Sequence, residues 1–99
     1  MAATFSVEEI RALSIPTIVN LLQERGWAIK SDQLAFVIRK TSPYSDQMKY
    51  GIWEVYAPYK TSLADYNHRV FECISAIADE YSLSLYGAYN LILSRSQVS

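Results

Sequence analysis

A long amphipathic segment, residues 63–81, most constrains how this chain can fold. Its apolar side chains recur every three or four residues, the period of an α-helix with one buried face. They are Leu63, Tyr66, Val70, Ile74, Ile77 and Tyr81. The pattern predicts a helix from about Ser62 to Tyr81, capped by Thr61 or Ser62, that buries this stripe against the rest of a small core.

Length and composition indicate one small intracellular domain spanning residues 1–99. The chain has 99 residues, of which 51% are hydrophobic and 19% charged, as in folded domains. Residues 1–10 lack the basic start and long apolar run of a signal peptide. A lone cysteine cannot form an internal disulfide. We therefore expect a soluble, cytoplasmic protein, with no membrane contact.

Two short helices are predicted before any strand. Ser6 and Glu9 have the spacing of a capping box, which starts the first helix. Pro16 lacks a backbone donor, so that helix should end near Ser14, which can cap a second helix with proline in its first turn. Gly26 supplies the left-handed residue that ends the second helix, as in a Schellman motif.

Alternating apolar residues predict strands over 34–40 and 50–57, the second ended by Pro58. Residues 27–29 can add a short third strand, and the polar stretch 41–47 is typical of a turn. In the second strand, one face is predicted to carry Trp53, Val55 and Ala57.

The segment 83–93 fits either a helix or another strand. As a helix it is capped by Ser84 and packs Leu85, Ala88, Tyr89 and Ile92. As a strand it aligns Leu85, Gly87, Tyr89, Leu91 and Leu93 on one face. Gly87 and Asn90 are poor helix formers, and we favour the helix only slightly.

These elements predict an α+β two-layer sandwich, in which a small antiparallel sheet packs against helices on one face. The sheet would have two or three strands, or more if the C-terminal segment joins it. So small a sheet leaves exposed edges, and association with another chain is a natural way to cover them.

Few residues could carry catalysis. His68 and Glu72 lie one helical turn apart, which suits a general base with its carboxylate but equally an ordinary surface pair. Cys73 reads as a small, partly buried hydrophobic residue. Ligand spacing for a metal and a glycine-rich phosphate loop are both lacking. We expect no cofactor and no enzyme activity; a His-dependent hydrolase or nuclease is the least favoured alternative.

Basic residues gather in the strand region, at Lys30, Arg39, Lys40 and Lys49. Together with nearby aromatic residues they could form a face for single-stranded nucleic acid. We favour the other interpretation, in which they are charges on strand edges that deter aggregation. The formal net charge of −1 also argues against a protein whose main task is to neutralise phosphates.

Aromatic residues on the second strand suggest a protein contact instead. We expect Trp53, Tyr56 and Tyr59 to form the contact surface, because large aromatic side chains dominate interface energetics. The leading hypothesis is a non-catalytic protein–protein interaction module, most simply a homodimer, and a nucleic-acid-binding protein is the alternative.

The order of these motifs resembles a group of small bacterial proteins of unassigned function. The matching residues are Leu21–Leu22 with Gly26–Trp27, then Val55–Pro58, then Asp65–Tyr66 with the amphipathic run to Tyr81. The first half is also faintly similar to HicA-type mRNA interferase toxins, which implies a double-stranded-RNA-binding-like topology at most. Their catalytic histidine lies on a strand, whereas His68 is on the predicted helix, so no nuclease residue carries over.

Overall fold

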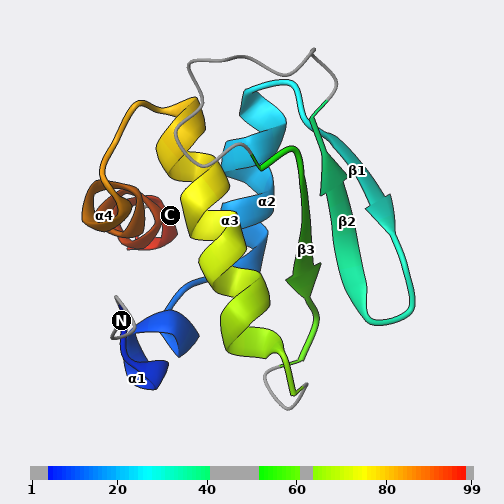
Figure 1. Ribbon diagram of the computed structural model, residues 1–99, viewed down its shortest axis with the longest axis horizontal. Coiled ribbons are helices and arrows are strands. Elements are labelled where there is room, and N and C mark those ends of the chain that lie inside the picture. Colours follow the sequence, from blue (N-terminus) through cyan, green and yellow to red (C-terminus); the bar gives the residue numbers. More distant parts are fainter. Residues whose placement is uncertain (1–4, 41–51, 61–63, 98–99) are drawn as a thin grey trace.

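Three short strands form one antiparallel sheet in the order β1–β2–β3 (Figure 1). The computed structural model describes residues 5–40, 52–60 and 64–97. Within these ranges four helices accompany the sheet, so the α+β prediction is confirmed. In chain order the elements are α1 (Val7–Arg11), α2 (Ile15–Glu24), β1 (Ala28–Ser31), β2 (Ala35–Arg39), β3 (Glu54–Pro58), α3 (Tyr66–Glu80) and α4 (Leu85–Gln97).

The register of the strands defines an inner and an outer face of the sheet. Ile38 of β2 lies between Ile29 of β1 and Val55 of β3, and this row faces the helices. On the next row Val37 lies between Lys30 and Tyr56, and alternation turns these side chains to the outer face. The inner face of the sheet is therefore apolar, whereas the outer face carries both charged and apolar side chains.

Helices α2 and α3 supply most of the packing against the sheet. Helix α2 contacts all three strands, whereas α3 lies alongside β3 (Figure 1). The predicted stripe of α3 is buried at Tyr66, Val70, Ile74 and Ile77, as expected. Helix α3 also covers the free edge of β3, because the Cys73 thiol donates a hydrogen bond of 3.6 Å to the Tyr56 carbonyl. The edge of the sheet at β3 is thus covered by a helix of the same chain.

Both predicted boundary motifs of the first two helices are present. Ser6 and Glu9 form the reciprocal capping box at the start of α1, and Ser14 caps α2. At the end of α2, Gly26 has a φ of 90° and the Trp27 amide donates to the Leu22 carbonyl. This is the 6→1 bond of a Schellman motif, and the left-handed backbone explains the glycine.

The start of α3 differs from the prediction. The helix begins at Tyr66, and Asp65 is its N-cap residue, without a side-chain capping bond. The Asp65 carboxylate instead accepts from Arg69 Nε at 2.9 Å, and the Asp65 backbone, with φ −102° and ψ 18°, lacks the extended conformation that is usual for a capping residue. Thr61 and Ser62, the predicted caps, lie outside the described residues, as do Leu63 and Lys49 and the turn 41–47.

The end of α3 has a feature that sequence reasoning did not identify. The Leu83 amide donates to the Ala78 carbonyl and the Ser82 amide to Asp79, which is a second Schellman motif. Its left-handed residue is Ser82, with a φ of 54°. A serine therefore occupies a position at which glycine is the usual residue.

The C-terminal segment is a helix, as favoured. Ser84 Oγ accepts a hydrogen bond from the Gly87 amide, and Ala88, Tyr89 and Ile92 are buried. A Cβ atom on Gly87 would lie 3.2 Å from Ser84 Oγ and 3.2 Å from Leu83 Cβ. The close approach of the capping residue accounts for a glycine inside this helix.

Strand β3 is shorter than predicted and includes Pro58 as its last residue. The ladder to β2 uses Val55 and Ala57, since the flanking Tyr59 amide donates to the Leu34 carbonyl. The backbone nitrogen of Pro58, which carries no hydrogen, therefore points away from β2, so the ladder between the two strands loses no hydrogen bond. Trp53 precedes the strand and is 52% exposed, so it does not share the buried environment of Val55.

Candidate functional site

The three aromatic residues predicted as a contact surface lie at different places. Trp53 precedes β3 and Tyr59 follows it, which separates them by roughly 20 Å along an extended chain. Tyr56 lies between them on the outer face, whereas Tyr59 packs on Phe36 of the inner face. They do not form one continuous patch, and each has to be considered with its own neighbours.

An exposed apolar cluster surrounds Tyr59 at the end of the sheet where β1 turns into β2. Leu34, Phe36 and Tyr59 make up this cluster, which we call the hairpin-end patch; the Tyr59 amide donates a hydrogen bond to the Leu34 carbonyl. Leu34 is 62% exposed and Tyr59 is 41% exposed. The Tyr59 ring meets Phe36 edge-to-face at 4.9 Å between centroids. Exposed apolar residues that cluster in this way mark contact surfaces more often than scattered ones.

The turn that holds Leu34 is unusual in its chemistry. The Asp32 amide donates to the Ala35 carbonyl at 2.9 Å, so Gln33 and Leu34 form a two-residue connection. Turns are usually occupied by polar residues or glycine, whereas Leu34 is a large apolar residue, and neither Gln33 nor Leu34 has a positive φ. A leucine there contributes nothing to the turn. Sequence reasoning placed Leu34 in a strand, and a leucine directly after the polar run Ser31–Gln33 is the signal that could have identified it.

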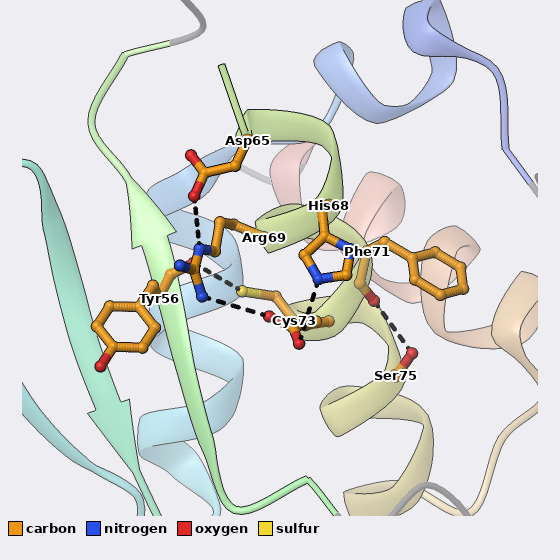
Figure 2. Close-up of polar contacts among 8 residues, drawn as sticks. Tyr56, Asp65, His68, Arg69, Phe71, Cys73 and Ser75 are labelled. Atoms are coloured by element: carbon orange, nitrogen blue, oxygen red, sulfur yellow. Dashed lines mark hydrogen bonds and ion pairs between the residues drawn. The ribbon is translucent and has the colours of Figure 1, made fainter. Parts of the chain in front are cut away.

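Tyr56 belongs to a cluster of charged side chains on the outer side of β3 (Figure 2). The Arg69 guanidinium reaches from α3 and lies 4.8 Å from the Tyr56 ring centroid. The hydrogen bond from Arg69 lowers the pKa of the Asp65 carboxyl, and the same bond raises the pKa of Arg69. Both groups are therefore charged across the physiological range, and each neutralises the other.

A cleft of about 260 Å³ lies beside this cluster, between β3, the start of α3 and the hairpin end with Asp32 and Leu34. Tyr56, Pro58, Asp65 and Arg69 are among the residues that line it. Arg69 is held by Asp65 and also lies 3.8 Å from Glu72. Its charge is thus already matched by two carboxylates, and the cleft offers no free cation from Arg69 to an anionic ligand.

The basic residues predicted to contact nucleic acid do not share a surface as far as the structure describes them, which leaves out Lys49. Lys30 and Arg39 belong to the outer face, but Arg39 donates to Glu54 at 2.9 Å. Lys40 forms a largely buried ion pair with Glu80, at 14% and 12% side-chain exposure. Its Nζ lies 5.8 Å from the Trp27 ring centroid on the helical side of the sheet. The described members thus form no basic stripe, and we do not propose nucleic-acid binding.

His68 and Glu72 form the surface pair that their spacing predicts. His68 Nε2 lies 3.6 Å from a Glu72 carboxylate oxygen, and the His68 side chain is 70% exposed (Figure 2). Neither residue lines the cleft beside Tyr56 or the two clefts beside Glu24. A general base needs a substrate held within hydrogen-bond reach, whereas the His68 side chain is largely exposed in the part of the chain that the structure describes.

Cys73 is more deeply buried than expected. It is fully enclosed between α3 and β3, and burial raises the pKa of its thiol to about 12. A nucleophilic cysteine needs a depressed pKa and access to its substrate. Cys73 has the opposite properties, and Figure 2 shows it directed at the β3 backbone.

Comparisons with known proteins identify no relative of this chain. No protein-family model matches it, and neither a curated protein nor a solved structure shows significant similarity to it. The resemblances seen in the sequence therefore stay predictions. Among the described residues, no helix is long and apolar enough to cross a membrane. The same part of the chain contains no group of three or more potential metal ligands.

Proposed function

We propose that this protein is a non-catalytic protein–protein interaction module that associates with itself through the hairpin-end patch. The observation that carries the proposal is the exposure of Leu34, at 62%, in a turn that has no structural need for it. Because the chain's one cysteine can form no internal disulfide, the role is proposed for the cytoplasm.

The patch has the composition of an interaction site. Tyrosine and phenylalanine supply large apolar areas at a low cost in side-chain entropy, and they are enriched at the centres of interfaces. The edge-to-face contact between Phe36 and Tyr59 holds both rings in place before any partner arrives. A preformed patch of this kind loses little freedom on binding, which favours affinity.

Light scattering over a range of protein concentrations tests the proposal. Leu34→Ser removes the most exposed large apolar side chain of the described residues, and Val7→Ser is the matched control, because Val7 is 47% exposed but lies on α1. We expect wild type and Val7→Ser to associate alike, and Leu34→Ser to raise the dissociation constant at least tenfold, or about 1.4 kcal/mol. Equal effects of the two substitutions would contradict the proposal.

A further inference from the structure

Strand β1 is the one open edge of the sheet in the part of the chain that the structure describes. Strand β3 is covered by α3, whereas β1 pairs only with β2 and lies at the opposite side of the sheet from α3 (Figure 1). Three of its four residues are exposed and Ile29 is partly buried. An open edge presents backbone donors and acceptors that another strand can use.

The ladder between β1 and β2 shows which backbone groups are open. The bond from the Asp32 amide to Ala35 fixes the alternation, so Lys30 and Asp32 direct their backbone groups at β2. Ile29 and Ser31 therefore direct their amides and carbonyls outward. An incoming strand would bond to these two residues.

We infer that β1 pairs antiparallel with β1 of a second copy, with Ser31 on the two-fold axis, so that Lys30 of each copy faces Asp32 of the other. This inference rests on the proposed self-association and names its geometry. The two sheets would join into one continuous six-stranded sheet, closing both open edges by a symmetric contact.

Charge selects this register over its neighbours. Lys30 and Asp32 lie two residues apart, so both project from the outer face of the edge strand. With the axis at Lys30, the two lysines would oppose each other, and like charges directly opposite destabilise a sheet. With the axis at Ile29, Lys30 would face Ala28 and Asp32 would be left without a partner strand. Only the axis at Ser31 forms two cross-strand ion pairs.

Lys30 is free to make this contact. It is exposed, and no ion pair holds it within the described residues, unlike Arg39, Lys40 and Arg69. A lysine on an edge strand commonly discourages pairing. Here the same lysine discourages the wrong registers and favours the one that places it opposite a carboxylate.

The proposed register also brings the hairpin turn into the interface. Pairing about Ser31 places Gln33 in the turn of each copy opposite Ile29 of the other copy, and Leu34 is the next residue of that turn. The second chain would then lie beside the turn that carries Leu34. The turn and the open edge become parts of a single interface.

A charge-swap experiment tests the pairing by light scattering. Lys30→Glu alone places two carboxylates opposite each other at each contact, and Asp32→Lys alone places two ammonium groups there. Each variant should therefore weaken self-association at least about tenfold. In an equimolar mixture, each of the two contacts again joins opposite charges. We expect the mixture to recover the wild-type dimer, which also shows that both variants are folded.

A proline variant gives a second, independent readout. Ser31→Pro removes an amide that points away from β2, so the fold should keep its far-ultraviolet circular dichroism while the dimer is lost. Failure of the mixture to recover, or an undisturbed Ser31→Pro dimer, would overturn the β1 pairing. If Leu34→Ser still abolishes association in that case, the proposed function stands without this geometry. A wild type that is monomeric throughout would refute both.

Discussion

Replacement of Lys40 by methionine should destabilise the fold far more than its place at a strand end suggests. The ammonium group of Lys40 pairs with the Glu80 carboxylate across the junction of β2 and α3. Both side chains are nearly enclosed, at 14% and 12% exposure. Lys40→Met would leave Glu80 in that enclosed position without its cation.

The size of the effect follows from this burial. Removing one member of a fully buried ion pair costs about 3–5 kcal/mol, because the remaining charge is uncompensated. The slight exposure here lowers the expected loss to about 2–3 kcal/mol. Arg25 cannot take over, because its guanidinium donates to the backbone carbonyl of Glu80 and lies over Tyr81. Replacing both members, as in Lys40→Met with Glu80→Gln, should restore stability to within about 1 kcal/mol of wild type.

Urea denaturation followed by tryptophan fluorescence measures these differences. The matched control is Arg39→Met, the neighbouring residue, whose pair with Glu54 is exposed at 61% and 22%. Its loss should cost about 0.5–1 kcal/mol or less. Equal losses for the Lys40 and Arg39 variants would refute the reasoning. Additive effects of the Lys40 and Glu80 substitutions would refute it equally.

Three further predictions concern single positions. Because the pKa of Cys73 is about 12 in the folded protein against an ordinary 9.0, the unfolded state loses its proton first as pH rises above 9.0. Between about pH 8 and about pH 10, wild type should lose about 1.4 kcal/mol more stability than Cys73→Ala in urea titrations; parallel losses would contradict the buried thiol. Ser82→Gly should raise the melting temperature slightly and Gly26→Ala should lower it by roughly 4–8 °C, since both positions have a left-handed backbone. If both substitutions shift the melting temperature in the same direction, backbone strain does not determine the change in stability. Trp53→Ala should change the dimer dissociation constant less than about threefold, because Trp53 lies far from the hairpin-end patch, whereas a loss of about 2 kcal/mol would restore the interface expected from the sequence.

Local signals predicted the helices well. The capping box of Ser6 with Glu9 and the Schellman ending at Gly26 depend on residues within one turn, and the structure has both. The stripe of α3 follows from a period that burial imposes on any amphipathic helix. In the C-terminal segment, the alternation that suggested a strand was misleading, because Gly87 fits its helix for a local steric reason.

Features that depend on contacts distant in sequence could not be predicted. The Lys40–Glu80 pair joins residues forty positions apart, so Lys40 looked like a surface charge beside Arg39. Because Arg39 and Lys40 are consecutive, their side chains point to opposite faces of the sheet, and the predicted basic surface is divided between these faces. Tyr56 and Tyr59 were separated by the same alternation. The open edge at β1 became visible only once α3 was seen to cover the edge of β3.

The solution mass of the wild-type protein, measured by light scattering from low micromolar to about millimolar concentration, tests the proposed self-association most directly. We predict a mass that rises with concentration towards twice that of one chain and then stays constant, because a two-fold contact closes on itself. A mass that remains that of one chain at every concentration would contradict it.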